Sequence, residues 1–278
     1  MKLDKYFTKQ CAKIDRALLG YLPSPEGHAQ KLHEAMRYAV MSGGKRVRPI
    51  LALAACEAVG GDEKQVMPAA CALEMIHSYS LVHDDLPCMD DDDIRRGQPT
   101  CHKKFGEYTA LLAGDALLTL AFSLLSQAKL SKNAKTIERQ LLALHYISQA
   151  AGVSGMVGGQ SVDMDYQNRS MSLPLLEYVH ARKTGALIAV SLQAGACLGG
   201  GTSKQVEALF RYGKALGLLF QIVDDILDKE GYAKYLGLTE AHQEALQLRD
   251  RAKKEIAFLG KRANTLSAIA DFILERKH

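Results

Sequence analysis

Two clusters of aspartates are the residues of this sequence whose types and spacing most clearly suggest chemistry. The first, Asp84–Asp93, holds six aspartates in ten positions, and the second, Asp224–Asp228, closes an apolar segment. Asp224 and Asp228 are four residues apart and therefore share one helix face, where like charges repel each other. Hard divalent cations relieve such repulsion, and Mg²⁺ takes one or two carboxylates while leaving room for water and phosphate.

The first cluster is expected to follow the end of a helix. Pro87 disfavours helical structure at Leu86, so Asp84 and Asp85 should lie at a helix C-terminus, where the macrodipole opposes negative charge. A solvated loop is the ordinary explanation of one acidic run. Two runs that each close a strongly apolar helix favour metal binding instead, and neither has the ligand spacing of an EF-hand.

Basic residues beside glycine breaks add an anion-binding pattern. They lie in Gly43–Pro49, Arg95–Gly97 and Arg182–Gly185. Arginine offers a bidentate fork to phosphate oxygens and lysine offers a point charge. Taken singly, each basic segment is typical of a solvent-facing surface. Together with the aspartates, they indicate two diphosphates bound side by side, one through metal and one through cations alone.

The elements that position these groups are predicted to be helices. Ala and Leu dominate, there are only 7 prolines, and no convincing alternation of polar and apolar residues indicates a sheet. The predicted helices are 28–41, 49–59, 67–85, 108–128, 134–151, 174–199, 204–228, 236–259 and 263–276. No joint resembles an interdomain linker. We therefore predict one all-α domain over residues 1–278, a large helical bundle with the two aspartate motifs facing each other across a central cavity.

Composition argues against several other classes of protein. The net charge of +4 is spread along the chain and gives no indication of a nucleic acid partner. Six scattered cysteines without metal-ligand spacing indicate reduced thiols. The first residues lack the apolar stretch of a signal peptide, and no segment is judged apolar for long enough to span a bilayer. We expect a cytoplasmic protein.

Several segments resemble one known family. The stretch from Ala72 to Ala121, which includes the run LEMIHSYSLVHDDLPCMDDDDIRRG, resembles the bacterial short-chain trans-prenyltransferases, in particular the farnesyl diphosphate synthases (geranyltranstransferases). Gly43–Pro49, Gly155–Asp163, Lys183–Gly185 and Phe220–Asp228 match further family motifs in family order. The resemblance covers nearly the whole chain. It implies the isoprenoid synthase fold, a homodimer, and head-to-tail condensation of isopentenyl diphosphate with dimethylallyl and geranyl diphosphate.

The resemblance also implies roles for individual side chains. Asp84, Asp90 and Asp224 would hold three Mg²⁺ ions on the allylic diphosphate, with Asp228 as a further ligand and Asp85 in support. The side chains expected to contact the same diphosphate are Arg95, Lys183, Thr184 and Gln221. Those expected to bind isopentenyl diphosphate are Lys45, Arg48, His77 and Arg96. The predicted catalytic residues are Asp84, Asp85, Asp90, Arg95, Lys183 and Asp224.

Tyr79 bears on the length of the product. It lies five residues before Asp84, on the order of 7.5 Å down a helix axis, and the family places an aromatic residue there in enzymes that stop at fifteen carbons. Ordinary core packing is the alternative role. A geranylgeranyl diphosphate synthase is the alternative within this fold, and Tyr79 argues against it.

Two further functions remain open. A class I terpene cyclase uses similar metal chemistry but needs no second diphosphate, so Lys45, Arg48 and Arg96 argue against it. A non-catalytic helical subunit would not require intact acidic motifs.

The sequence departs from the family pattern after Asp228. The family carries a long loop there, with a lysine in a Gly-Lys-(Ser/Thr)-Thr-Tyr segment that closes over the allylic diphosphate. Here Lys229-Glu230-Gly231 leads directly to Tyr232, which matches the far end of that loop. Either the protein lacks the loop, or the sequence is numbered across a gap left by a disordered lid, which is the explanation we favour. An intact mass of 30.4 kDa would contradict the gap.

Overall fold

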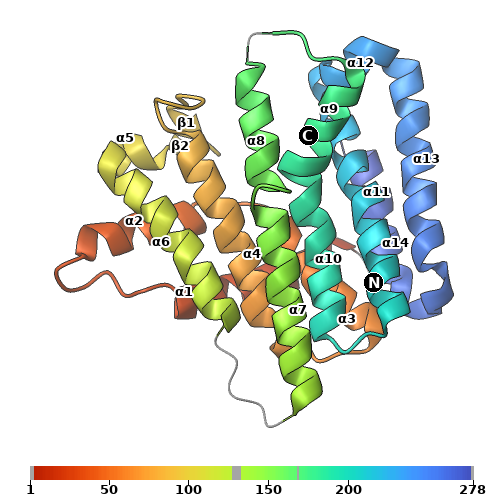
Figure 1. Cartoon of the computed structure of the whole chain (residues 1–278), viewed down its shortest axis with the longest axis horizontal. Coiled ribbons are helices and arrows are strands. Elements are labelled where there is room, and N and C mark those ends of the chain that lie inside the picture. The colour runs from red at the N-terminus through yellow and green to blue at the C-terminus, as the bar shows by residue number, and fades with distance from the viewer. Residues whose placement is uncertain (1–2, 127–132, 168, 277–278) are drawn as a thin grey trace. The chain divides into compact units, whose positions relative to one another are not determined.

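The structure is a computed structural model, and it describes residues 3–126, 133–167 and 169–276 (Figure 1). The chain divides into two compact units, of which one comprises Met1–Ile50 with Met67–Leu130. The other comprises Leu51–Val66 with Ser131–His278. Almost every regular element in the described ranges is a helix, which confirms the all-α prediction.

Helices and one short hairpin build the first unit. Its elements are α1 (Leu3–Tyr21), α2 (Gln30–Met41), the first residues of α3 (Val47–Val59), most of α4 (Glu63–Asp84), β1 (Ile94–Arg95), β2 (Gln98–Pro99), α5 (Cys101–Phe105) and α6 (Glu107–Ser126). Helix α6 packs against α2 and α5. The antiparallel strands β1 and β2 pair Ile94 with Pro99 and Arg95 with Gln98, and they form the one small sheet in the described part of the chain.

Local sequence rules explain where the helices of this unit begin and end. α2 ends at Met41, and Gly43 and Gly44 then take φ values of 91° and 127°, which other residues rarely adopt. α4 ends at Asp84, as Pro87 predicts. It begins at Glu63 rather than 67, because the Asp62 side chain accepts a hydrogen bond of 3.0 Å from the Lys64 N–H and caps the helix.

The second unit is a set of long helices with one π-helical segment. Its elements are the rest of α3, the first turn of α4, α7 (Ala134–Ala151), α8 (Met156–Asp165), α9 (Leu173–Val179), the π-helix η1 (His180–Gly185), α10 (Ala186–Leu198), α11 (Ser203–Asp228), α12 (Gly231–Leu236), α13 (Leu238–Ile256), the 3₁₀ segment η2 (Ala257–Ala263) and α14 (Asn264–Glu275). α11 packs against both α10 and α13.

Two predicted helices of this unit differ from those observed. The predicted helix 174–199 is interrupted by the π-helix His180–Gly185, which its continuous apolar pattern did not reveal. The predicted helix 236–259 is divided at Gly237, whose φ of 81° ends α12 before α13 begins. Helices α1, α5, α8 and α12 were not predicted from the sequence.

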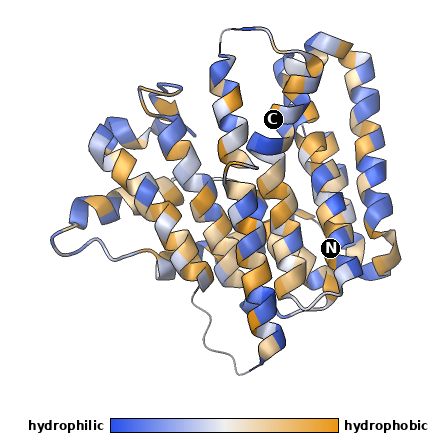
Figure 2. Ribbon diagram, viewed as in Figure 1, coloured by the Kyte–Doolittle hydropathy of each residue, from blue (hydrophilic) through white to orange (hydrophobic). Residues whose placement is uncertain are grey.

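α10 forms the core of the second unit. All of its residues except Ala186 and Gln193 are buried. Figure 2 shows hydrophobic residues along α10, whereas α13 carries many hydrophilic residues, the pattern of a helix with one solvent-facing side. A Cβ on Gly195 would lie 2.1 Å from the carbonyl oxygen of Ala52, so this glycine lets α10 pack directly on the backbone of α3.

Helix α6 departs from one expectation. Among the described residues, Glu107–Ser126 is the one helix that is long and apolar enough to cross a membrane by length and composition. The prediction that no segment is apolar for long enough therefore does not hold by this test. Core helices of soluble proteins pass the same test, and one such helix is weak evidence for a membrane span.

Candidate active site

The first aspartate motif forms a tight reversal of the chain after α4. The N–H of Asp90 donates a hydrogen bond of 2.9 Å to the carbonyl oxygen of Asp84, and the N–H of Met89 donates one of 2.8 Å to Leu86. These bonds close the loop that Pro87 begins. The fold therefore brings the backbones of Asp84 and Asp90, the two metal ligands predicted in this motif, next to each other.

Asp85 is turned into the protein and holds Arg95. The Arg95 guanidinium contacts Asp85 Oδ1 at 2.6 Å and Asp92 Oδ2 at 3.1 Å. Burial raises the pKa of Asp85, and the hydrogen bond and charge of Arg95 counter that effect. Asp85 therefore fixes the position of a cation that the sequence analysis expects on the allylic diphosphate.

A short hairpin sets the position of Arg96. Arg96 and Gly97 connect β1 to β2 with φ values of 54° and 74°, the signs of a type I′ turn. The guanidinium of Arg96 donates to the carbonyl oxygen of Gly43. A Cβ on Gly44 would lie 2.7 Å from Arg96 Nη1, so Gly44 leaves room for this side chain.

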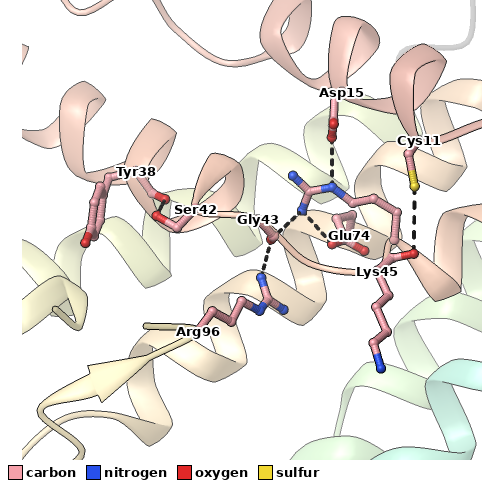
Figure 3. Close-up of polar contacts among 9 residues, drawn as sticks. Cys11, Asp15, Tyr38, Ser42, Gly43, Lys45, Glu74 and Arg96 are labelled. Carbon is pink, nitrogen blue, oxygen red and sulfur yellow. Dashed lines mark hydrogen bonds and ion pairs between the residues drawn. The ribbon is translucent and has the colours of Figure 1, made fainter. Parts of the chain in front are cut away.

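Arg46 and Arg48 are two residues apart, but their guanidinium groups differ in their hydrogen-bond partners. Arg46 is buried, and its guanidinium donates to Asp15 Oδ1 at 2.8 Å and to Glu74 Oε1 at 2.9 Å (Figure 3). Arg48 Nε is also buried but has no hydrogen-bond partner in the described part of the chain. Desolvation lowers the pKa of Arg48 to about 10, partly offset by Glu74. The buried donor of Arg48 is therefore left for a ligand, whereas Arg46 serves the fold.

His77 lies among these cations. Burial lowers the pKa of His77 well below its usual value, and the charges of Arg48 and Arg96 lower it further. A neutral imidazole surrounded by positive charge, next to an unpartnered Arg48 Nε, suits an anionic ligand. Lys45 is exposed, and Figure 3 shows its side chain extending away from Asp15. The structure thus brings Arg48, His77 and Arg96 together, and their binding of isopentenyl diphosphate stays a prediction.

In the second unit, Lys183 is presented by the π-helix. Its Nζ lies 2.6 Å from Asp163 Oδ2 at the end of α8. A Cβ on Gly159 would lie 2.3 Å from the backbone nitrogen of Lys183, so this glycine allows α8 to approach the π-helix closely. Thr184 follows Lys183 and is half-buried. Single π-helical turns within α-helices are frequent at functional sites.

The second aspartate motif contains carboxylates in two different environments. Asp225 is held by the protein, because its Oδ2 accepts a hydrogen bond of 2.8 Å from the N–H of Tyr232 and its Oδ1 lies 3.8 Å from His180 Nε2. Asp224 is half-buried and receives a weak 3.5 Å hydrogen bond from Gln221 Nε2. Asp228 is exposed one turn further along α11.

Arg276, which the sequence analysis missed, also contacts this motif. Its guanidinium pairs with Asp224 Oδ1 and donates a hydrogen bond of 2.9 Å to the carbonyl oxygen of Phe220. Arg276 follows α14 and is separated from Asp224 by 52 residues. No local pattern in the sequence connects two residues so far apart.

The comparisons with known proteins decide the family. The polyprenyl synthetase family model matches residues 29–239. The chain belongs to the polyprenyl synthetase family. A chloroplastic geranylgeranyl pyrophosphate synthase of Capsicum annuum is 44% identical, over 98% of this chain and 78% of the relative. A dimethylallyltranstransferase of Fischerella ambigua (strain UTEX 1903) is 40% identical, over 99% of this chain and 84% of the relative.

Solved structures agree with the family. An apo FPP/GFPP synthase of Zymomonas mobilis is 39% identical and covers 98% of both chains, with a TM-score of 0.92. A geranyltransferase of Legionella pneumophila is 33% identical, covers 99% of this chain and 97% of its own, and has a TM-score of 0.90. The expected isoprenoid synthase fold is confirmed. As a polyprenyl synthetase, the protein is a Mg²⁺-dependent prenyltransferase that elongates an allylic diphosphate with isopentenyl diphosphate.

The donor set of this polyprenyl synthetase fits magnesium. Burial raises the pKa of Asp224, and the charges of Asp228 and Asp225 raise it further, against the effect of Arg276. Hard oxygen donors that repel one another in this way are suited to Mg²⁺. Asp91, Asp93 and His102 also place ligand atoms within 4.8 Å of one another, a group that the sequence analysis did not single out. Which carboxylates bind metal stays a prediction.

Proposed function

We propose that this prenyltransferase is a farnesyl diphosphate synthase, which joins isopentenyl diphosphate first to dimethylallyl and then to geranyl diphosphate. The observation that supports this proposal is the position and burial of Tyr79. This residue lies in α4 five residues before Asp84, is only 6% exposed, and packs edge-on against His83 with 5.7 Å between ring centroids. A buried aromatic ring held in this way is suited to ending the cavity that receives the growing chain.

In this proposal, one group of residues binds isopentenyl diphosphate and another stabilises the departing diphosphate. Arg48, His77 and Arg96 bind the diphosphate of isopentenyl diphosphate and orient its double bond. Arg95, held by Asp85, and Lys183 stabilise the negative charge that develops on the departing diphosphate. Bound Mg²⁺, three ions in our proposal, would add Lewis-acid stabilisation at the same oxygens, held by Asp84, Asp90, Asp224 and Asp228.

The bond between the allylic carbon and its diphosphate breaks, which leaves an allylic cation. The double bond of isopentenyl diphosphate then attacks this cation, and a proton is lost to the released diphosphate. Apolar walls must exclude water, which would otherwise trap the cation.

The product identifies the function directly. The protein is incubated with Mg²⁺, dimethylallyl diphosphate and labelled isopentenyl diphosphate, and the dephosphorylated products are separated by chromatography. We expect a C15 alcohol as the main product. A C20 main product would instead support the geranylgeranyl alternative that the Capsicum annuum relative represents, and a cyclic hydrocarbon would support a cyclase.

Substituting Tyr79 tests the basis of this proposal. Tyr79→Ala and Tyr79→Met should lengthen the main product beyond fifteen carbons, because they remove the ring that ends the cavity. Tyr6→Ala is the matched control, since Tyr6 is equally buried but lies in α1. An unchanged C15 product in both Tyr79 variants would mean that Tyr79 is ordinary core packing.

We also propose a cytoplasmic homodimer. The support lies in apolar side chains that remain exposed on individual helices. On α7 they include Ile137, Leu141 and Leu142, of which Leu141 is 61% exposed, and on α6 they include Tyr108, Leu111 and Leu112. Light scattering after gel filtration should give about 61 kDa for two chains of this 278-residue sequence, each of 30.4 kDa. A mass near 30 kDa would contradict the dimer.

A further inference from the structure

The side chain of Arg276 is fixed beside the second aspartate motif by α11 itself. Its guanidinium lies 4.0 Å from the ring centroid of Phe220 and donates to the carbonyl oxygen of the same residue. Only 9% of the Arg276 side chain is exposed, and its Nε is buried with no hydrogen-bond partner among the residues that the structure describes. Since Phe220 is one turn before Asp224, these contacts place a permanent positive charge at that carboxylate.

The two oxygens of Asp224 have unequal partners. Oδ1 pairs with Arg276, whereas the one contact of Oδ2 within residues 3–126, 133–167 and 169–276 is the 3.5 Å hydrogen bond from Gln221. Asp225 is engaged by Tyr232 and does not share the Arg276 charge in any described contact. Arg276 is therefore the cation that balances Asp224 when no metal is bound.

A divalent cation at Asp224 would have to approach this guanidinium. Two like charges a few ångströms apart repel strongly in a half-buried site, where solvent screens them less than in bulk water. The repulsion is relieved when an anion arrives with the metal, because the anion compensates both positive charges. Metal binding at the second motif is therefore coupled to the presence of a diphosphate.

We propose that Arg276 is a positioning residue that acts through Asp224: it weakens metal binding at the second aspartate motif until a diphosphate is present. The proposal rests on the metal-ligand role of Asp224 given under the proposed function, and it does not depend on product length. It predicts that removing the Arg276 charge tightens the binding of free metal and weakens the dependence on diphosphate.

The test measures Mn²⁺ binding by electron paramagnetic resonance, with and without inorganic pyrophosphate. The wild-type protein should bind its Asp224-dependent Mn²⁺ weakly alone and more tightly with pyrophosphate. Arg276→Met keeps an apolar stem over Phe220 and removes the charge, so it should bind free Mn²⁺ about tenfold more tightly. Arg276→Lys retains the charge and should behave like the wild type. Asp224→Asn identifies which bound Mn²⁺ belongs to this motif.

A matched control separates this role from simple anchoring of α14. Arg249 pairs with Asp271 of α14 at 3.8 Å and does not contact Asp224, so Arg249→Gln should leave Mn²⁺ binding unchanged. Equal or weaker Mn²⁺ binding in Arg276→Met would overturn the proposal, and so would tighter binding in Arg276→Lys. If Asp224→Asn binds Mn²⁺ like the wild type, the metal role of Asp224 itself fails, which a product assay would not reveal.

Discussion

The two aspartate motifs obtain their neighbouring cations in different ways. In the first, the cation comes from the hairpin that follows, since Arg95 of β1 lies 10 residues after Asp85 and 3 after Asp92 and is held by an Asp85 side chain that is 5% exposed. In the second, the cation comes from a distant part of the chain, because Arg276 follows α14 and pairs with Asp224. The first arrangement is built locally and buried, whereas the second depends on tertiary packing and on half-buried carboxylates.

The contrast suggests a division of labour. A cation locked by a buried carboxylate keeps its position whether or not a ligand is bound. A cation paired with a metal-ligand candidate must give up part of that contact when the site is loaded. Substitutions around the two motifs, compared with one another, test whether this difference is real.

The largest effect should come from the predicted metal ligands themselves. Asp84→Asn and Asp224→Asn should each lower kcat/KM by about 10³-fold or more, because each removes several kcal/mol of metal-assisted charge stabilisation. Incorporation of labelled isopentenyl diphosphate measures the loss. Asp225→Asn is the control, since Asp225 is already held by the Tyr232 N–H, and its activity loss should be much smaller. A full loss in Asp225→Asn alone would reverse the assignment within the motif.

The second pair of substitutions compares Arg46, whose guanidinium is paired with two carboxylates, with Arg48, whose buried Nε lacks a hydrogen-bond partner among the described residues. Arg46→Met should lower the free energy of unfolding by about 3–5 kcal/mol, because it leaves Asp15 and Glu74 without their partner. Arg48→Met should leave stability nearly unchanged and raise the KM for isopentenyl diphosphate by roughly 10–100-fold. Urea unfolding and steady-state kinetics give the two quantities. Equal stability losses would show that Arg48 also belongs to the scaffold.

Protonation of the buried imidazole of His180, next to the second motif, should make the stability of the protein depend on pH. Burial lowers the pKa of His180 to about 4. Between pH 4 and 6.5 the unfolded chain therefore binds more protons at this residue than the folded protein, so stability falls as pH falls. The loss from pH 7 to pH 5 is about 2 kcal/mol for this group. Urea unfolding of His180→Gln should show a correspondingly flatter profile, and an identical profile would contradict the assignment.

The smallest effects should be the stability losses caused by substituting Asp85 and Asp163, the two carboxylates that hold Arg95 and Lys183. Asp85→Asn should cost about 1–3 kcal/mol of stability, because it weakens a buried charge-assisted hydrogen bond to Arg95. Asp163→Asn should cost less than about 1 kcal/mol, because the Lys183–Asp163 pair is about one-third exposed. Thermal unfolding of both variants provides the comparison. The opposite order would mean that the second region is the more rigidly built.

Local rules made much of this architecture predictable. The ends of α2 and α4 follow from Gly43-Gly44 and from Pro87, whose backbone preferences act over a few residues. The second motif could be placed at the end of a helix because its apolar pattern continues to Val223. The family resemblance supplied the roles of the remaining side chains.

Contacts between distant residues could not be predicted in the same way. Arg46 reaches Asp15 across 31 residues and Glu74 across 28, so its scaffold role has no local signature. Arg276 pairs with Asp224 across 52 residues. The sequence placed Arg46 in a basic segment, but only three-dimensional packing separates it from Arg48.

The π-helix His180–Gly185 has a consequence for how this enzyme can change. Its wider turns place an extra residue between α9 and α10, in the manner of a single-residue insertion that the helix has absorbed. Deleting one residue there would allow a continuous α-helix and rotate Lys183 by about 100° relative to the flanking helix. The lysine would then turn away from Asp163. A one-codon deletion, with no change of side-chain chemistry, would thus redirect the cation that the proposed reaction places on the departing diphosphate.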